Sequence, residues 1–184
     1  MENTIVTLKK GEGRSFKQGG LWIYDNEIET IKGRFKNGHL VEVHDYNDYP
    51  LGIGYINQNS KIRVRMLSRN VQQEINDAFF KMRLSHAWQY RKDTVDTSSC
   101  RIVFGEADFL PGLVIDKFED VLVIQALTLG MDLLKERLVN LMKEVLQEDG
   151  ITIRGVYERS DAKERDKEGL SRIKGFIGEP FATK

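Results

Sequence analysis

The chain has 184 residues, of which 40% are hydrophobic and 30% are charged, and its formal net charge at pH 7 is zero. This length is enough for one large hydrophobic core or two compact ones, since domains usually have roughly 100 to 150 residues. No stretch approaches the ~18 apolar residues of a membrane-spanning helix, and the N-terminus lacks the apolar core of a signal peptide. We therefore expect a soluble, cytoplasmic protein without a membrane partner.

The zero net charge hides an asymmetry between the two halves of the chain. Residues 1–92 hold 15 Lys and Arg against 10 Asp and Glu, whereas residues 93–184 hold 13 against 18. A polyanionic partner such as a nucleic acid would therefore bind the first half. An excess of this size also occurs by ordinary variation, so charge alone leaves nucleic-acid binding open.

The first third of the chain has the pattern of short β-strands. From Ile5 to Leu67, apolar segments alternate with glycines and polar turns. Residues 40–43 and 51–55 are predicted strands joined by a polar turn. Strict alternation in residues 61–66 predicts a strand with one apolar face and one basic face, the latter formed by Lys61, Arg63 and Arg65. So many short strands predict a small barrel.

A helix is predicted next, with Asn76 as its N-cap and its end near Arg91. Four side chains recur in it at helical spacing and are expected to form its packed face. They are Phe79, Met82, His86 and Tyr90. We expect this helix to link two domains, which gives domains over residues 1–72 and 99–184 and a linking helix over residues 73–98.

The second half alternates strands with one long helix. The helix is predicted from about Met131 to Glu148, because Leu134, Leu138, Leu141 and Val145 form an apolar stripe. Strands are predicted over residues 101–105, 112–118, 121–127, 151–157 and 172–177. The pattern predicts an α+β fold in which a small β-barrel precedes a small antiparallel sheet with one packed helix.

The segment over residues 159–169 is almost entirely polar or charged. We expect an exposed loop or a frayed helix, because a mixed charge run is usually solvated. A docking surface is the alternative interpretation.

Basic and aromatic residues of the first half form a candidate RNA surface. Cations neutralise phosphates, and aromatic rings stack on unpaired bases. The candidate residues are Lys10, Arg14, Trp22, Lys61, Arg63, Arg65 and Arg69. Trp22 could instead be a core residue, and the glycines of GEGRSFKQGG (residues 11–20) could serve turns as well as a close approach to phosphate.

Other motifs argue against nucleotide, metal and cysteine chemistry. Residues 11–13 lack the third glycine and the helix of a dinucleotide-binding loop, and no Walker sequence occurs. The three histidines, at positions 39, 44 and 86, lack metal-ligand spacing, so we predict no metal site. The single cysteine, Cys100, is expected to be a semi-buried packing residue, in a chain without disulfides.

Several carboxylates of the second half could suggest acid–base catalysis, but structural roles explain them more simply. Glu106 and Asp108 precede the turn at Leu110-Pro111-Gly112 and can accept backbone N–H bonds there. Glu158, Arg159 and Asp161 can pair locally. We therefore predict that Glu106, Asp108, Glu158, Arg159 and Asp161 act in turns or at a domain interface, and we assign no catalytic residue.

Long ordered phrases give the chain a family resemblance. GEGRSFKQGGLWIYDNEI (residues 11–28) and GHLVEVHDYNDYPLGIGYINQNSKIRVRML (residues 38–67) resemble the PUA domain of the bacterial 23S ribosomal RNA cytosine-C5 methyltransferases. FGEADFLPGLVIDKFEDVLVIQALTLGMD (residues 104–132) and GVYERSD (residues 155–161) are similar to the central domain of that family. The resemblance implies an RNA-binding PUA pseudo-barrel followed by a scaffold domain of strands around one helix.

Members of this family continue into a Rossmann-type catalytic domain with a glycine-rich S-adenosylmethionine loop and a cysteine that attacks cytosine C6. No segment of this sequence matches those motifs, and Cys100 lies before the central-domain phrases. The resemblance therefore implies that the missing catalytic domain and S-adenosylmethionine belong to a longer parent, and that this chain binds ribosomal RNA without catalysis. The alternatives are a stand-alone RNA-binding adaptor and a protein-interaction module that uses the acidic second half.

Overall fold

The computed structural model describes residues 4–182, and the chain divides into two compact units. The first unit contains residues 1–73 together with residues 167–169, and the second contains residues 74–166 together with residues 170–184. A short segment from late in the sequence therefore belongs to the first unit. Among the described residues, no helix combines the length and the apolar composition needed to cross a membrane.

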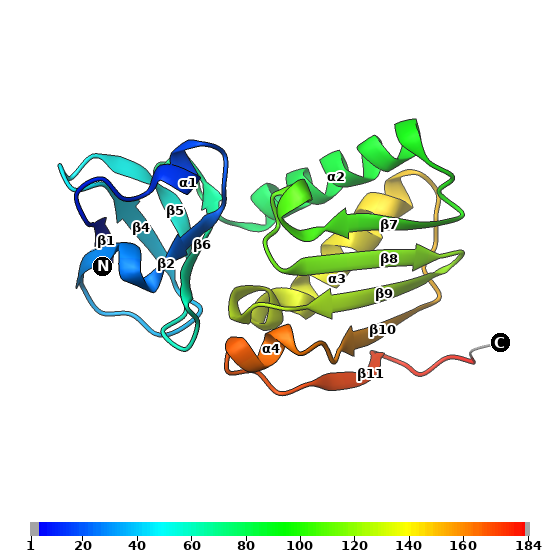
Figure 1. The fold of residues 1–184 in the computed structure, drawn as a ribbon. Helices are drawn as coiled ribbons and strands as arrows, with labels where there is room; N and C mark the ends of the chain where they lie inside the picture. Colours follow the sequence, from blue (N-terminus) through cyan, green and yellow to red (C-terminus); the bar gives the residue numbers. More distant parts are fainter. Residues whose placement is uncertain (1–3, 183–184) are drawn as a thin grey trace. The chain divides into compact units, whose positions relative to one another are not determined.

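The first unit is built on a six-stranded sheet with the order β2-β6-β5-β4-β1-β3. Figure 1 shows that the strands of this sheet curl around one another. Neighbouring strands pair antiparallel except β1 and β4, which pair parallel. The helix α1 (Arg14–Lys17) follows β1, and the 3-10 helix η1 (Asp25–Glu27) joins β2 to β3. The strands are β1 (Ile5–Leu8), β2 (Trp22–Tyr24), β3 (Ile28–Lys32), β4 (Leu40–His44), β5 (Pro50–Ile56) and β6 (Ile62–Ser68).

This sheet curls around a hydrophobic core supplied by alternate residues of its strands. Ile23 of β2, Val64 of β6 and Phe16 of α1 are all buried in it. Strand β6 follows the alternation of its sequence, since Val64 and Met66 are buried whereas Arg63 and Arg65 are partly exposed. The predicted strands in residues 40–67 and the barrel-like character of this part are confirmed.

Two glycines let β5 lie close to β6. A Cβ atom on Gly54 would lie 2.3 Å from the carbonyl oxygen of Arg65, and one on Gly52 would lie 2.2 Å from the carbonyl oxygen of Ser68. A side chain at either position would push β6 away. The glycines therefore fix the position of the strand that carries Arg63 and Arg65.

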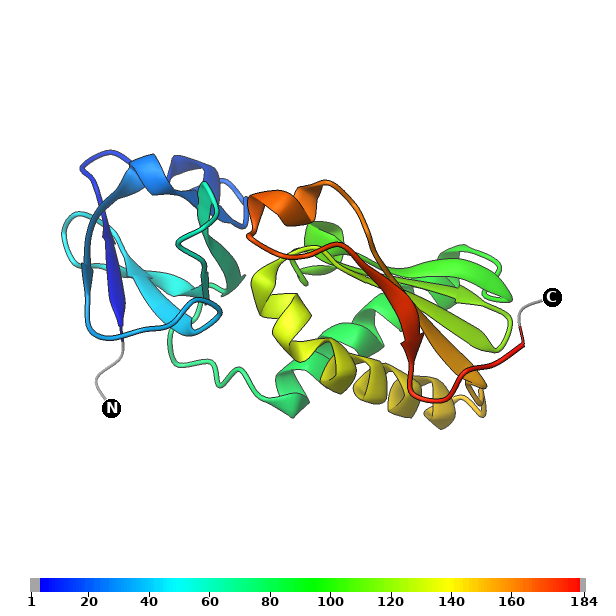
Figure 2. The same cartoon turned by 90° about the horizontal axis from the view of Figure 1, so that it is seen from below.

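The second unit is a five-stranded sheet with the order β11-β10-β9-β8-β7. Its strands are β7 (Ser99–Phe104), β8 (Leu113–Phe118), β9 (Val121–Ala126), β10 (Gly155–Ser160) and β11 (Ile173–Ile177). Its helices are η2 (Gly105–Asp108), a 3-10 turn, and the α-helices α2 (Asp77–Thr94), α3 (Leu129–Glu148) and α4 (Glu164–Lys167). The helices α2 and α3 lie on one side of the sheet (Figure 2).

The α+β class predicted from the sequence is confirmed, with one difference in the sheet. Strands β9 and β10 pair parallel, while the other neighbours in this sheet pair antiparallel. A parallel pair needs a long crossover connection, and α3 supplies it. A second difference is that two helices, not one, pack in this unit, because α2 contacts both α3 and β7.

Helix α2 begins as predicted but packs through a different face. The side chain of Asn76 accepts a hydrogen bond from the backbone N–H of Phe79 at 3.1 Å, which confirms the N-cap. The buried side chains are Phe79, Phe80, Leu84, Ala87 and Trp88. Met82, His86 and Tyr90 are exposed, so the predicted packed face is wrong apart from Phe79. Apolar residues occur on several sides of this helix, and packing against α3 and β7 selects which of them are buried.

The polar segment over residues 159–169 is also more ordered than predicted. Residues 159–160 belong to β10, which begins at Gly155 rather than at Ile151. Arg165 in α4 is 0% exposed and Glu168 is 3% exposed. The expectation of an exposed loop is therefore wrong at these two charged residues, which are buried because each has ionic and hydrogen-bond partners.

Candidate nucleic-acid interface

Strands β2 and β6 place an aromatic ring opposite a basic side chain. Trp22 pairs with Arg65 in the antiparallel register, on the face away from the core residues Ile23 and Val64. The ring of Tyr24 lies edge-on to that of Trp22, with 6.3 Å between the ring centroids. Trp22 is only partly buried, so this pair of rings belongs to the surface of the first unit and not to its core.

The Arg65 guanidinium lies between an aromatic ring and a carboxylate. Its Cζ atom is 5.2 Å from the centroid of the Trp22 ring, within the range of a cation–π interaction. Its Nη2 atom donates to Oε1 of Glu168 at 3.1 Å. The Arg65 side chain is 15% exposed. It is thus fixed in place by two partners of the same unit.

Two other predicted cations are held against the protein in a weaker way. Arg63 is 3.9 Å from a carboxylate oxygen of Asp25 and also donates to the carbonyl oxygen of Gln58. Arg69 is exposed, but its guanidinium lies 4.1 Å from the centroid of the Phe16 ring and donates to the Phe16 carbonyl oxygen. The second contact joins the end of β6 to α1.

The remaining predicted cations point into solvent. The side chains of Lys10 and Lys61 are exposed and form no hydrogen bond or ion pair with residues 4–182. Arg14 is exposed and uses its Nε atom to donate to the carbonyl oxygen of Gly11 at 2.9 Å. The predicted basic residues therefore divide into an outward set, Lys10, Arg14 and Lys61, and a held set, Arg63, Arg65 and Arg69.

Strand β6 separates the outward cations. Lys61 directly precedes β6, and Arg69 at the other end of the strand contacts α1, the helix that Arg14 begins. A strand of this length spans roughly 20 Å at about 3.3 Å per residue. The Trp22–Arg65 pair lies between the two ends of this strand.

The predicted turn residues of the second unit have specific partners. Asp108 forms a bidentate ion pair with Arg91, with N–O distances of 3.0 and 2.7 Å, and accepts the backbone N–H of Phe104 at 2.7 Å. Glu106, at the start of the same turn, is partly buried, and its carbonyl oxygen accepts the N–H of Phe109. These contacts close the turn that follows β7.

The carboxylates in β10 and directly after it pair with cations. Glu158 is 4% exposed and accepts a hydrogen bond from Lys135 of α3 at 3.0 Å. Burial alone would lower the pKa of Lys135, but the bond to Glu158 and the charge of Asp132 outweigh it and raise the pKa. Asp161 pairs with Lys174 at 2.9 Å and lies 3.7 Å from Arg159. Each carboxylate is matched to a cation, which is the arrangement of a structural ion pair.

Sequence reasoning missed two buried charged residues of the segment 164–168. Arg165 donates to the carbonyl oxygens of Ser171 and Ala126 and pairs with Asp132 at 2.9 Å. Glu168 accepts hydrogen bonds from Asn57 and Arg65. No local pattern distinguishes them from the solvated charges beside them, because their partners lie far away in the sequence.

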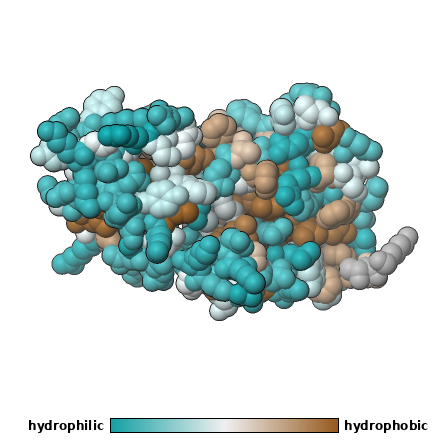
Figure 3. Space-filling view, in the orientation of Figure 1, coloured by the Kyte–Doolittle hydropathy of each residue, from teal (hydrophilic) through white to brown (hydrophobic). Residues whose placement is uncertain are grey.

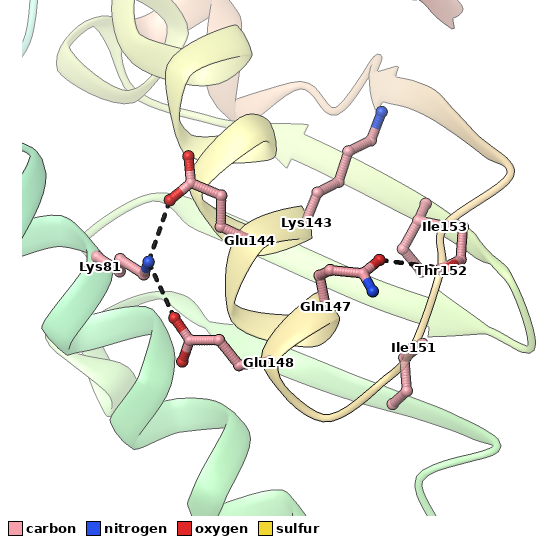
Figure 4. Close-up of a pocket in the computed structure, with 8 residues that line it drawn as sticks. All are labelled: Lys81, Lys143, Glu144, Gln147, Glu148, Ile151, Thr152 and Ile153. Atoms are coloured by element: carbon pink, nitrogen blue, oxygen red, sulfur yellow. Dashed lines mark hydrogen bonds and ion pairs between the residues drawn. The ribbon is translucent and has the colours of Figure 1, made fainter.

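The second unit also has a shallow hollow of about 490 Å³ beside α2 and α3 (Figure 4). Lys81 binds Glu144 at 3.1 Å and Glu148 at 2.9 Å at its edge. The hydrogen bonds to Glu148 and Glu144 raise the pKa of Lys81. Both glutamates of the hollow are thus paired with Lys81, and Lys143 is a further charged residue of its lining.

The described residues were also compared with the requirements of a metal site and of a reactive thiol. Residues 4–182 contain no group of three or more His, Cys, Asp or Glu side chains placed to hold a metal ion. Cys100 is partly buried, and this burial raises the pKa of its thiol. A raised pKa leaves little thiolate at neutral pH, which disfavours a nucleophile.

A comparison with known protein families identifies the kind of domain in the first unit. Residues 6–69 match the family described as a PUA-like domain. This match covers β1 to β6 and includes the Trp22–Arg65 pair. The first unit therefore contains a PUA-like domain, as its phrases predict.

Relatives of the whole chain are named as ribosomal RNA large subunit methyltransferase I. The protein from Pseudoalteromonas atlantica is 35% identical over 171 residues, which is 91% of this chain and 42% of the relative. The protein from Pseudoalteromonas translucida is 35% identical over 184 residues, which is 97% of this chain and 45% of the relative. The chain is homologous to these methyltransferases and spans less than half of their length.

Solved structures share the fold. A protein assigned as a SAM-dependent methyltransferase from Streptococcus mutans superposes with a TM-score of 0.76 at 15% identity, over 97% of this chain and 44% of that one. A second structure, of an assigned methyltransferase in complex with SAH, gives a TM-score of 0.70 at 16% identity, over 86% of this chain and 40% of that one.

Proposed function

We propose that this chain is the RNA-docking and scaffold portion of a SAM-dependent methyltransferase that acts on 23S ribosomal RNA at cytosine C5. The observation that supports this proposal most directly is the β2–β6 surface of its PUA-like domain, where Trp22 and Arg65 lie between exposed cations. The homology to ribosomal RNA methyltransferases supplies the substrate class. In this proposal the chain binds RNA and contributes no catalytic residue.

The surface has the two components that bind RNA. Lys10, Arg14 and Lys61 are exposed cations without an ion pair to residues 4–182, so they can neutralise phosphates without first giving up a carboxylate of that range. Trp22 and Tyr24 offer aromatic edges and faces to unpaired bases, and such stacking is the usual way in which proteins bind single-stranded RNA. A cytoplasmic location, where ribosomal RNA is found, is part of the same proposal.

The residues described do not fit the methyl donor. S-adenosylmethionine sites of the Rossmann type place a glycine-rich loop between a strand and a full helix, where backbone N–H groups meet the ligand. The glycines of residues 11–20 lead only into the four-residue helix α1, Gly105 opens the 3-10 helix η2, and Gly112 leads into the strand β8. We therefore derive no methyl-transfer step from these residues and propose that the donor binds in a further part of the parent.

RNA binding across a salt series tests the proposal. The affinity of the chain for a fragment of 23S ribosomal RNA is measured between about 50 and 200 mM salt, for the unmodified protein and for the triple variant K10A/R14A/K61A. Each phosphate contact changes the slope of log K against log salt by about 0.7 to 0.9. The triple variant should therefore have a slope shallower by about 2 to 3 and a lower affinity.

A matched control comes from the second unit. The triple variant K81A/K143A/K163A removes the same charge from residues outside the first unit. It should keep both the affinity and the slope of the unmodified protein. Equal losses in the two triple variants would show non-specific attraction and contradict the proposed surface.

A scaffold role for the second unit rests on its open sheet face. The side of the sheet away from α2 and α3 carries Phe104, Phe118 and Phe176, which are 56%, 53% and 40% exposed. Figure 3 shows hydrophobic surface over these strands. Cations on this side pair with carboxylates, as Arg101 does with Asp116 at 2.7 Å. An apolar surface with neutralised charges suits a protein domain better than RNA.

We propose that this open face contacts the methyltransferase part that the longer relatives have in addition. The turn residues Glu106, Asp108, Glu158, Arg159 and Asp161 would then hold the sheet that presents the face. The gene sequence beyond codon 184 distinguishes the hypothesis of a longer enzyme from the hypothesis of a stand-alone adaptor. A reading frame without a methyltransferase part would favour the adaptor, and loss of RNA binding in every assay would favour the protein-interaction module.

A further inference from the structure

Glu168 makes contacts that the RNA-binding proposal does not use. It lies in residues 167–169, which belong to the first unit although more than ninety residues separate them from β6. Its side chain is 3% exposed. One carboxylate oxygen accepts from Asn57 at 3.0 Å and the other accepts from Arg65 at 3.1 Å. The Asn57 side chain also donates to the Glu168 carbonyl oxygen at 3.0 Å, so the carboxylate cannot rotate away freely.

The carboxylate remains charged in this buried place. Burial alone would raise the pKa of Glu168, but hydrogen bonds from Asn57 and Ser60 and the charge of Arg65 outweigh it and lower the pKa. At neutral pH the pair is therefore an anion against a cation. The Glu168 carboxylate therefore largely neutralises the Arg65 charge before any RNA binds. Separating the two would leave a buried charge without its partner, which costs free energy.

We infer that Glu168 is a positioning residue for the RNA surface: it holds the Arg65 guanidinium against the Trp22 ring and withdraws the Arg65 charge from phosphate binding. The inference rests on the proposed RNA-binding role of the first unit. In this arrangement Arg65 supports a fixed aromatic platform, and Lys10, Arg14 and Lys61 carry the phosphate contacts. Trp22 is presented in one orientation, which lowers the entropy lost when a base stacks on it.

A double-mutant cycle on RNA binding tests this division of roles. In the unmodified chain, Arg65→Ala should leave the salt slope for a 23S ribosomal RNA fragment unchanged, because the Arg65 charge is already neutralised. Glu168→Gln keeps the shape of the side chain and releases the charge of Arg65, so the slope should become steeper by about 0.7 to 0.9. The double variant E168Q/R65A should return to the original slope.

The matched control is Glu158→Gln, which makes the same change at a buried, ion-paired glutamate of the second unit. It should leave the slope unchanged, although it lowers stability as Glu168→Gln does. A slope that falls by about 0.7 to 0.9 in Arg65→Ala would overturn the inference, because Arg65 would then contact phosphate directly. An unchanged slope in Glu168→Gln would overturn it as well.

A second measurement does not depend on RNA. The chain has two tryptophans, so its ¹H–¹⁵N spectrum contains two indole signals, and Trp22→Phe identifies the one from Trp22. Glu168→Gln should shift the Trp22 signal strongly and the Trp88 signal little, whereas Glu158→Gln should leave the Trp22 signal in place. If the Trp22 signal does not move, Glu168 does not hold Arg65 against the ring. If it moves but RNA never binds, the proposed function fails while the positioning contact stands.

Discussion

Arg91 and Asp108 form a bidentate ion pair in the second unit that is shielded from water. Their N–O distances are 3.0 and 2.7 Å, and their side chains are 12% and 9% exposed. The same carboxylate accepts the backbone N–H of Phe104 at the end of β7. The pair thus joins α2 to the turn after β7.

Removing one partner of this pair should destabilise the second unit. We expect Asp108→Ala to lower its free energy of unfolding by about 3 kcal/mol, because Arg91 then remains partly buried without its counter-charge. Urea unfolding followed by circular dichroism measures the change. The control Glu144→Ala acts on an exposed pair with Lys81 and should cost less than about 1 kcal/mol. Equal effects of the two substitutions would contradict a structural role for Asp108.

Gly54→Ala should destabilise the first unit by steric conflict alone. The new Cβ atom would lie 2.3 Å from the Arg65 carbonyl oxygen, and a backbone atom cannot move aside cheaply. We expect a loss of about 3 kcal/mol or more, at the upper end of overpacking effects. Gly19→Ala is the comparison, since no atom beyond its chain neighbours lies within 4 Å of its Cβ position, and its backbone φ of +110° is what opposes the substitution. That variant should cost about 1 kcal/mol.

Trp22→Ala should weaken RNA binding without changing its salt slope. Loss of base stacking costs about 1 to 3 kcal/mol per base, and no charge is removed. The dissociation constant should therefore rise roughly tenfold or more. Tyr49→Ala removes another exposed aromatic ring of the first unit, 66% exposed in the β4–β5 turn, and should bind as the unmodified chain does. Similar affinities of Trp22→Ala and the unmodified chain would argue against a stacking platform.

The lowered pKa of Glu168 predicts a defined loss of stability in acid. A carboxylate whose pKa is lower in the folded state stabilises that state above its ordinary pKa of about 4.3, and this contribution disappears as the pH falls through the folded value. At pH 7 we expect Glu168→Gln to cost about 2 kcal/mol, since hydrogen bonds to a charged group are lost. The difference should narrow below about pH 4. Unfolding curves of both proteins at several pH values across this range measure the difference in free energy of unfolding. A difference that stayed constant with pH would contradict the prediction.

Cys100 should react slowly with thiol reagents in the folded protein. Burial raises the pKa of its thiol, so little thiolate is present at neutral pH. The rate of labelling by a disulfide reagent should rise sharply when urea unfolds the chain. A native rate equal to the unfolded rate would show an accessible, activated thiol.

The sequence predicts well those elements whose pattern is local. The alternation of residues 61–66 identifies both the strand β6 and its two faces, because one face must meet the core. Asn76 identifies the start of α2, since N-cap preferences depend on the nearest turn alone. The packed face of α2 is not predictable in this way, because Met82 and Tyr90 also carry large side chains with much apolar surface, and only tertiary packing decides which side chains of the helix are buried.

The candidate site is predicted only in part for a related reason. Basic residues of the first half could be named from charge, but their roles depend on partners that are distant in sequence. Arg65 and Lys61 look equivalent in the alternating segment, yet one is paired with Glu168 and the other is exposed. Arg165 and Glu168 lie in a run of charges whose members differ only through tertiary contacts.

Because residues 167–169 complete the first unit, that unit is encoded and synthesised as two separate segments of the chain. A gene fragment cut at the limits of the family match, residues 6–69, would leave Asn57 and Arg65 without the Glu168 carboxylate. During translation, the pairing of Arg65 with Glu168 must wait for about a hundred further residues, which takes a ribosome roughly 5 to 20 s. Until then a nascent chain carries the Arg65 cation without the Glu168 carboxylate, while it is still attached to a particle built largely of RNA.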